Sequence, residues 1–320
     1  MELLEKYDVK LNDAILADEG GKHTPLYAEM VEKYSPQYIA GGAGQNSCRV
    51  AQWMLQIPNS TAYFGCVSDD AYGEQLEKCS REDGVNVCYM KTDKAGTGTC
   101  AVLVNGGERS LVANLGAANS FDVAHLSTPE ATAVIEGSSI YYVTGFFLTV
   151  SVPSILQLAK DASENNKTFC MNLSAPFLIQ FFGDQMAECM PYTDFVFANE
   201  SEAAEYGKAK GYGEDLGVVA LKLAAQPKAN ASRPRIVVFT QGSECTIVAS
   251  HGEVTRYDVD PLPKELLVDT NGAGDAFVGG FLAQLHLKKP IAECVRAGHW
   301  AARTIIQRSG CTFPKECEYI

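Results

Sequence analysis

The sequence predicts an α/β protein, with a mostly parallel sheet flanked by helices on both faces and a small β element inserted into it. From about residue 130 onward, short β-branched or aromatic runs alternate with helical stretches, which is the spacing of βαβ units. Residues 87–115 differ, because two runs of alternating side-chain character flank an Asn-Gly turn signal in "NGGE", residues 105–108. That pattern is typical of a hairpin.

Four strands are expected in the alternating part, with a helix over 151–166 after the first. They are residues 140–145, 168–174, 195–199 and 236–242. A small or polar residue stands at or near the end of each: Gly145, Asn172, Asn199 and Gly242. The carboxyl ends of parallel strands form the ligand crevice of such sheets, so the sequence predicts a site at this edge.

Composition narrows the class of protein and its partners. The chain has 320 residues, of which 46% are hydrophobic and 20% charged, which is enough for one large domain with its own core. A formal net charge of −13 argues against a nucleic acid or an anionic membrane as partner. None of the eleven cysteines forms a C-x-x-C pair. We therefore expect reduced thiols in a cytoplasmic or nuclear protein.

One uncharged stretch, residues 137–159, is long enough to span a membrane. Its first half is filled by β-branched and aromatic residues, Gly145 interrupts its middle, and Pro153 is suited to open a new helix. These features favour a strand, a loop and a helix in a core over a membrane span.

A glycine-rich stretch, "DTNGAGDAF" at 269–277, carries the clearest chemistry. Gly272, Ala273 and Gly274 leave the backbone uncovered, so their N–H groups can converge on an oxyanion at the start of a helix. Nearby N–H groups should keep Asp275 ionised, and its carboxylate could accept the proton of a hydroxyl that attacks a phosphoryl group. The alternative is structural, because Asp often caps helices and glycines open many of them.

Further residues make a family recognisable. "DTNGAGDAFVGGFL" resembles the C-terminal signature of the ribokinase-like (PfkB) carbohydrate and nucleoside kinases, and "AGGAGQNSCRVAQWML" at 40–55 resembles their N-terminal glycine signature. Other stretches are similar to the eukaryotic adenosine kinases of this family over nearly the whole chain: "FFGC", "GTGTCAVL", "ERSLVANLGAAN", "YVTGFFLTVS", "NLSAPF", "NESEA", "FTQG" and "RAGHWAA". The resemblance implies transfer of the ATP γ-phosphate to the 5′-hydroxyl of adenosine, giving AMP and ADP.

The resemblance also implies an organisation. We expect a single ribokinase-like kinase domain over 1–320, with a lid built from segments within about 9–40 and 87–119. The large α/β core is expected over 41–86 and 120–320. The family's adenosine kinases suggest a monomer.

Roles around the acceptor follow from the same resemblance. It makes Asp275 the catalytic base, and it places the anion hole on Gly272, Ala273 and Gly274. Arg109 on the lid would close over the transferred phosphate. The residues expected around adenosine are Gly41, Gly42 and Asn46 at the ribose and Leu16, Leu111, Ala113 and Phe147 at the purine. Each set has a plain alternative: a solvent-facing arginine, a tight glycine turn and an apolar core.

The residues that bind ATP are predicted from shorter motifs of the same family. The residues expected near ATP are Asn199, Thr240, Gly242 and Asn271. Asn199 and Glu202 form the family's N-x-x-E motif, linked to Mg²⁺ through water or phosphate. The same spacing is also a capping box at a helix start, and both interpretations stay open. The cofactor set is Mg²⁺ with ATP as co-substrate, and K⁺ as a further candidate activator.

One departure from the family concerns the start of its fold. The family chain opens with a strand reading roughly Gly-Asn-Pro-Leu-Leu-Asp, whose aspartate holds the ribose hydroxyls, whereas this sequence begins "MELLEKYDVKLNDAIL". The resemblance therefore predicts that the first strand of the family fold is missing and that activity is impaired. A truncated, weakly active or inactive nucleotide-binding isoform and a sugar kinase of the same superfamily remain as alternatives.

Overall fold

The computed structural model describes residues 2–11, 14–18, 20–105 and 108–319. The chain divides into two compact units. The first comprises residues 1–121, 262–279 and 300–320, and the second comprises residues 122–261 and 280–299. Two long helices each have residues in both units: α11 (Ala273–His286) and α12 (Ile291–Ile305).

A three-stranded sheet in the first unit has the order β1-β5-β4. Its strands are β1 (Ala14–Leu16), β4 (Thr97–Asn105) and β5 (Glu108–Gly116). The antiparallel pairing of β4 with β5 confirms the predicted hairpin strands, while the turn at Gly106 and Gly107 lies outside the described residues. β1 joins the other edge of β5 in parallel.

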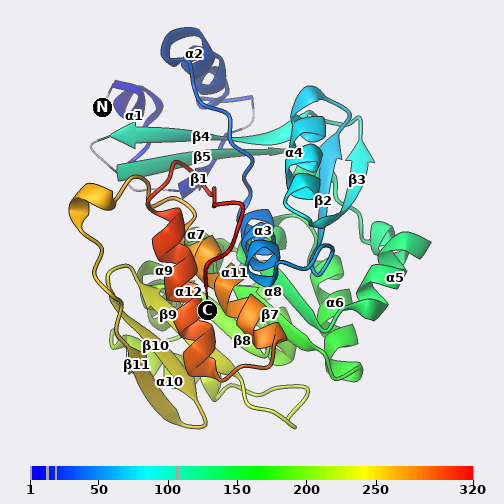
Figure 1. Ribbon diagram of the computed structural model, residues 1–320, viewed down its shortest axis with the longest axis vertical. Coiled ribbons are helices and arrows are strands. Elements are labelled where there is room, and N and C mark those ends of the chain that lie inside the picture. Colours follow the sequence, from blue (N-terminus) through cyan, green and yellow to red (C-terminus); the bar gives the residue numbers. More distant parts are fainter. Residues whose placement is uncertain (1, 12–13, 19, 106–107, 320) are drawn as a thin grey trace. The chain divides into compact units, whose positions relative to one another are not determined.

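Two helices cover one face of this sheet, α1 (Glu2–Tyr7) and α2 (Thr24–Tyr34) (Figure 1). Leu26 of α2 and Val112 of β5 are fully buried in the core between the helices and the sheet. Side chains alternate along a strand, so the face away from the helices carries the odd-numbered residues of β5 from 109 to 113. The hairpin therefore has one packed face and one available face.

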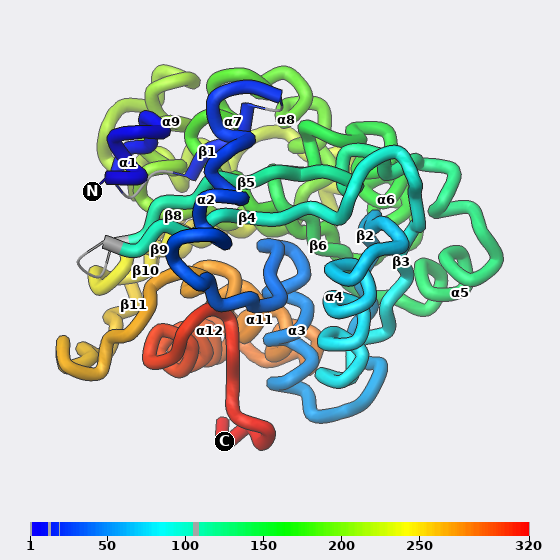
Figure 2. The backbone as a smooth tube through the Cα atoms, turned by 90° about the horizontal axis from the view of Figure 1, so that it is seen from above, coloured from blue at the N-terminus to red at the C-terminus, as the bar shows by residue number. Residues whose placement is uncertain are grey.

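A second, two-stranded sheet in the first unit pairs β2 (Ala62–Ser68) with β3 (Asn86–Thr92) in parallel over the full length of both strands. Helices α3 (Ala43–Leu55) and α4 (Ala71–Glu82) lie beside these strands (Figure 2). A short 3₁₀ turn, η1 (Ala117–Ser120), also packs near β2. β3, which falls within the lid segment expected at 87–119, thus pairs with β2 and not with the three-stranded sheet.

The last turns of α12 and the residues after it pack against α3. Trp53 stacks on Trp300 and on Phe313, with ring centroids 5.3 and 5.1 Å away. The Arg49 guanidinium donates from Nε to Asp83 Oδ2 at 2.6 Å and from Nη1 to the carbonyl of Cys311 at 3.3 Å. These contacts hold the chain around residue 311 close to the start of α11.

The second unit is built on a six-stranded sheet in the order β11-β10-β9-β8-β7-β6. Its strands are β6 (Ile140–Thr144), β7 (Thr168–Asn172), β8 (Phe195–Asn199), β9 (Ile236–Gln241), β10 (Glu244–Ser250) and β11 (Glu253–Tyr257). The four predicted strands are confirmed as β6 to β9 and run parallel. β10 and β11 extend the sheet with antiparallel pairs that the sequence analysis did not predict.

Helices lie against both faces of this sheet, as predicted. One face packs against α6 to α10 in a core where Phe169, Met171 and Phe239 are fully buried. On the other face Phe195 and Phe197 meet Phe281 of α11 edge to face, at 5.8 and 5.2 Å. The remaining helices are α5 (Pro129–Gly137), α6 (Val152–Glu164), α7 (Pro176–Phe181), α8 (Gly183–Cys189), α9 (Glu200–Ala209) and α10 (Leu216–Ala224). The other 3₁₀ segments are η2 (Val123–Ser127), η3 (Gly145–Thr149), η4 (Met190–Tyr192) and η5 (Lys264–Leu266).

The uncharged stretch at 137–159 folds as predicted into a strand, a short turn and a helix, β6, η3 and α6. Pro153 lies in the first turn of α6, where its missing N–H costs nothing. Within the described ranges, no helix combines the length and the apolar character needed to cross a membrane.

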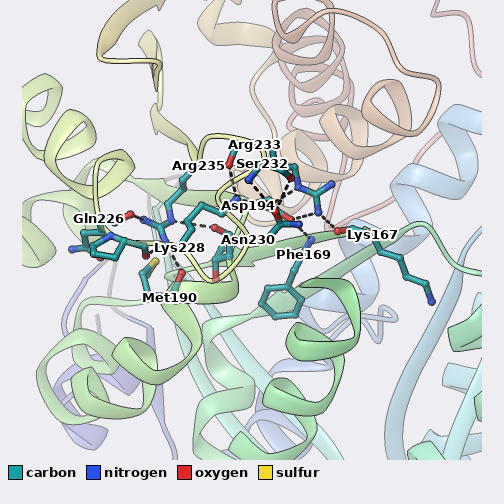
Figure 3. A network of polar contacts seen from close by, with 12 residues as sticks. Lys167, Phe169, Met190, Asp194, Gln226, Lys228, Asn230, Ser232, Arg233 and Arg235 are labelled. Carbon is teal, nitrogen blue, oxygen red and sulfur yellow. Dashed lines mark hydrogen bonds and ion pairs between the residues drawn. The ribbon is translucent and has the colours of Figure 1, made fainter. Parts of the chain in front are cut away.

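A polar network closes the amino ends of the central strands in the second unit (Figure 3). The buried carboxylate of Asp194 accepts hydrogen bonds from the backbone N–H of Phe169 and from the side chains of Lys228 and Arg233. Arg235 is 1% exposed, and all five of its N–H donors reach backbone carbonyls. Those carbonyls belong to Met190, Thr193, Leu223, Gln226 and Pro227. The network ties the loop before β9 to the strands, at the end of the sheet away from the predicted crevice.

Candidate active site

The glycine loop leads directly into α11. Gly272 has φ +80°, which favours glycine, and a Cβ there would lie 3.3 Å from the Cβ of Cys311. Nothing lies within 4 Å of the Cβ position at Gly274, so the backbone is open at that residue. The N–H of Ala273 closes a turn onto the carbonyl of Thr270 at 3.2 Å. The N–H groups of Gly274 and Asp275 follow at the start of the helix, where no preceding turn supplies a helical carbonyl, and this suits an anion.

Asp275 lies in the first turn of α11, where Asn46 of α3 reaches it. Asn46 Nδ2 donates to Asp275 Oδ2 at 2.9 Å, although the two residues are 229 positions apart in the chain. Gly279, one turn further along α11, explains this approach, because a Cβ there would lie 2.6 Å from the carbonyl oxygen of Ser47. A glycine on the contact face thus lets the two helices come close enough for the hydrogen bond.

The protonation of Asp275 differs from the sequence prediction. Burial raises its pKa to about 7, and the hydrogen bond from Asn46 opposes that rise only in part. The prediction of a carboxylate kept ionised by helix N–H groups was therefore wrong, because desolvation dominates the pKa and the hydrogen bond that opposes it comes from Asn46. Tyr63 and Cys311 are the neighbouring titratable groups, and burial raises the pKa of each to about 12, so both stay neutral at physiological pH. A group with a pKa near 7 is well suited to general base catalysis.

The other polar atom of the Asn46 side chain, Oδ1, has no hydrogen-bond partner among the described residues. This atom is buried, and the residue is 8% exposed. Gly42, at φ +99°, precedes α3, and its carbonyl accepts the N–H of Asn46. Gly41 and Gly42 thus form the entry to the helix that presents Asn46. A buried acceptor with no partner is costly unless a ligand or water supplies a donor.

The available face of the three-stranded sheet gathers the other predicted residues of the first unit. Leu16 pairs with Ala113, and Ala14 pairs with Leu111, so Leu16, Ala113 and Leu111 share one face with Arg109. The structure therefore brings these four together. Arg109 does not extend into solvent: its side chain is 10% exposed and ion-paired to Asp269, with Nε 2.9 Å from Oδ1.

The residues predicted for the nucleotide divide between the two units. Asn199 and Thr240 are register partners at the carboxyl ends of β8 and β9, which confirms that these strand ends adjoin. Gly242, at φ +58°, forms the turn from β9 into β10. Asn271 belongs to the first unit, where its N–H donates to Asp269 Oδ1. Phe147, predicted at the purine, lies on η3 at the border of the second unit's core.

The N-x-x-E motif forms a complete capping box. Asn199 Oδ1 accepts the N–H of Glu202, and Glu202 Oε2 accepts the N–H of Asn199. Glu202 Oε1 also accepts from Asn199 Nδ2 at 2.8 Å, and the residue is 4% exposed. Both carboxylate oxygens are thus engaged, so this pair does not fit a direct metal ligand. Within the described residues no group of three or more His, Cys, Asp and Glu side chains could hold a metal.

Comparison with known proteins assigns the family. The model of the pfkB family of carbohydrate kinases matches residues 1–317. The chain belongs to this pfkB family. Adenosine kinase 2 of Arabidopsis thaliana is 53% identical over 319 residues, covering 99% of this chain and 92% of the relative.

Solved structures of pfkB relatives are similar in fold. The adenosine kinase of Anopheles gambiae, solved with P1,P4-di(adenosine-5) tetraphosphate, has a TM-score of 0.96 at 50% identity and covers 99% of this chain and 94% of its own. The adenosine kinase of Schistosoma mansoni, solved with adenosine and AMP, has a TM-score of 0.91 at 35% identity, over 98% and 92% of the two chains. The ribokinase-like α/β fold is therefore confirmed, with mixed sheets and helices.

The sequence analysis of this pfkB kinase did not name two groups of residues that the structure places at the site. Asp269 opens the glycine loop, and its position two residues before Asn271 is the signal of an Asx turn. Cys100 and Val102 lie opposite Ala113 and Leu111 on the available face of the hairpin, which aligning the two strands across the Asn-Gly turn would have shown.

Proposed function

We propose that this pfkB kinase transfers the γ-phosphate of ATP to the 5′-hydroxyl of adenosine, giving AMP and ADP. The observation that carries the proposal is Asp275, a partly buried carboxylate with a raised pKa in the first turn of α11, held by Asn46. Adenosine is the acceptor because chains about half identical to this one over nearly their full length are adenosine kinases. Nothing in the comparisons favours a sugar as acceptor or an inactive nucleotide-binding isoform.

Asp275 acts as the base in this scheme. Its carboxylate accepts the proton of the 5′-hydroxyl as the oxygen attacks the γ-phosphorus, and the bond from phosphorus to the β,γ-bridging oxygen breaks to release ADP. The open backbone at Gly274 and the first-turn N–H groups of α11 supply donors for the charge on the transferred group. Gly272 and Ala273 shape the turn that presents them. Arg109 adds a positive charge that neutralises the phosphoryl oxygens.

Adenosine contacts follow from the unpaired acceptor and the available sheet face. Asn46 Oδ1, buried without a partner in the described chain, accepts a ribose hydroxyl, and the glycines at 41 and 42 leave space for the sugar. Leu16, Leu111 and Ala113 supply an apolar wall for the purine. Phe147 is proposed for the same wall on the strength of the resemblance.

We infer that the three-stranded sheet with α1 and α2 is a lid. Support comes from its construction, since the helices occupy one face and leave the face of Arg109 for a ligand. On the nucleotide side, Asn199, Thr240 and Gly242 sit at the carboxyl edge where such sheets bind ligands, and Asn271 belongs to the glycine loop. Mg²⁺ enters with the nucleotide as Mg-ATP. Water or phosphate would carry any link from the metal to the capping box of Glu202.

The missing first strand stays a prediction. In its support, β6 is the terminal strand of its sheet, and β2 has β3 as its one neighbour among the described strands. Each edge could accept a further strand, because unpaired edges leave backbone groups without partners. A monomeric state and K⁺ activation rest on the family resemblance, and a cytoplasmic or nuclear location rests on the cysteine content.

Release of ADP from Mg-ATP in the presence of adenosine tests the proposal. The wild-type chain should turn over with adenosine and not with ribose or fructose, and Asp275→Asn should lower kcat at least roughly a hundredfold with little change in nucleotide affinity. Unchanged turnover in that variant would remove Asp275 from the mechanism. The chain preceded by the family's opening strand is assayed in parallel, and equal activity of both would show that the strand is dispensable.

A further inference from the structure

Asp269 joins three separate segments of the first unit. Its Oδ1 accepts the Nε–H of Arg109 and the backbone N–H of Asn271, each at 2.9 Å, and its Oδ2 accepts the N–H of Gly310 at 3.0 Å. These donors come from strand β5, from the glycine loop and from the segment after α12. One carboxylate, 6% exposed as a residue, therefore fixes the hairpin arginine and the turn that opens the anion hole at the same time.

Arg109 is also bonded to the residue before Asp269. Besides the bond from Nε to Asp269, Nη2 donates to the backbone carbonyl of Val268 at 3.0 Å. A guanidinium is planar and rigid, so two bonds along one edge set the orientation of the whole group. The side chains of Arg109 and Asp269 are 10% and 8% exposed, and solvent screens such a pair far less than it screens a surface pair. The arginine is thus oriented by the loop that precedes Asp275.

We propose that Asp269 is a positioning residue, which holds the Arg109 guanidinium at a fixed place relative to the anion-hole loop and so prepares it for the transferred phosphate. The inference rests on the proposed kinase function. Its chemical logic is preorganisation: a cation already oriented before the reaction needs no reordering as charge develops. The same carboxylate shapes the loop through Asn271, so lid and loop share one anchor.

Replacing Asp269 would reduce activity even if its role were purely structural. Single variants therefore cannot distinguish a structural role from the positioning of Arg109. The test is a double-mutant cycle with Arg109→Ala, Asp269→Asn and the double variant, measuring kcat, the KM for each substrate and the denaturant midpoint. We expect Asp269→Asn to lower kcat about tenfold or more in the wild-type background. In the Arg109→Ala background the same change should lower kcat less than about twofold. Independent, multiplicative losses would overturn the inference.

Asp194→Asn is the matched control. Asp194 pairs with Arg233 at 2.9 Å in another arginine–aspartate contact with a buried carboxylate, which belongs to the second unit and lies at the amino ends of its strands. This variant should lower the denaturant midpoint and leave kcat unchanged. A conservative Asp269→Glu should recover part of the lost kcat, since it restores the charge at a changed distance. Loss of kcat in the Asp194 variant equal to that in Asp269→Asn would show that destabilisation alone explains the effect.

Hydrogen exchange gives a reading that does not depend on turnover. Amides of β5 should exchange several-fold faster in Asp269→Asn and in Arg109→Ala than in wild type without substrates, and at the wild-type rate in Asp194→Asn. Arg109→Ala leaves the bonds from Asn271 and Gly310 to Asp269 in place, so it serves if Asp269→Asn does not fold. Unchanged exchange in β5 would refute the tether. A wild-type chain that does not phosphorylate adenosine would instead refute the proposed function, whatever the exchange result.

Discussion

Replacing Asp275 by Asn should make the protein more stable at alkaline pH, although it removes the catalytic base. The folded-state pKa is raised from 3.8 to about 7, so the folded chain holds a proton that the unfolded chain has already released in this range. The free energy of unfolding of the wild type therefore falls as pH rises from about 4 to about 7. The Asn variant has no such loss, and its side chain keeps an oxygen for the Asn46 amide.

The magnitude follows from the shift. Between pH 5 and pH 8, the free energy of unfolding of the wild type falls only over the roughly two pH units up to the folded pKa of about 7. At about 1.36 kcal/mol per pH unit, the upper bound of this loss is about 2.7 kcal/mol. Asp275 is only partly buried, and screening by water reduces this to about 1 kcal/mol. Thermal unfolding of both proteins at pH 5 and pH 8 measures it. The stability advantage of the variant should grow by a few degrees of Tm between the two pH values. An advantage that stays constant or shrinks would refute the raised pKa.

Four further outcomes are expected. The kcat/KM of the wild type should fall about tenfold per pH unit below about 7, because the base at Asp275 must be deprotonated, and a flat profile down to pH 5 would contradict this assignment. Gly279→Ala should lower thermal stability by about 1–3 kcal/mol and reduce kcat, since its Cβ would press on the backbone of α3, while Gly183→Ala, with nothing within 4 Å, should behave as wild type. Arg235→Lys should lower the free energy of unfolding by roughly 3 kcal/mol or more in a denaturant titration, because an ammonium cannot reach five carbonyls. Asn199→Ala should cost about 1 kcal/mol through loss of the cap and should also raise the KM for ATP; an unchanged KM would leave Asn199 as a helix cap alone.

Sequence patterns predicted those parts of the fold that depend on local alternation. The strands β6 to β9 and the β4–β5 hairpin followed from side-chain periodicity and from an Asn-Gly turn. The pairing of β2 with β3 was not predictable in the same way, because tertiary packing and not local alternation decides which strands pair. Antiparallel β11 was missed because it is the edge strand and carries little apolar patterning, whereas β10 lies inside the sheet and its apolar run was overlooked.

The candidate site shows the same division. The residues on the glycine loop were found from their motif, those on the sheet face were implied by the family resemblance, and the structure places Asp275 beside Asn46. The pKa of Asp275 could not be predicted, because desolvation depends on what packs around the carboxylate and not on its neighbours in sequence. Asp269 stood in the quoted motif, but its partner Arg109 lies 160 residues earlier, a distance that no local pattern crosses.

The carbonyl cage around Arg235 has a consequence for how the surrounding sequence can vary. All its acceptors are main-chain oxygens, so the bonds depend on the path of the backbone and not on which side chains stand at those positions. For these bonds, the residues that supply the carbonyls can change in identity as long as their turns are kept. The arginine itself cannot be replaced, because no other side chain offers five donors in a fixed fork. Mutational scanning should therefore find Arg235 intolerant, while each carbonyl position tolerates change according to the burial of its own side chain: exposed Pro227 more than fully buried Leu223.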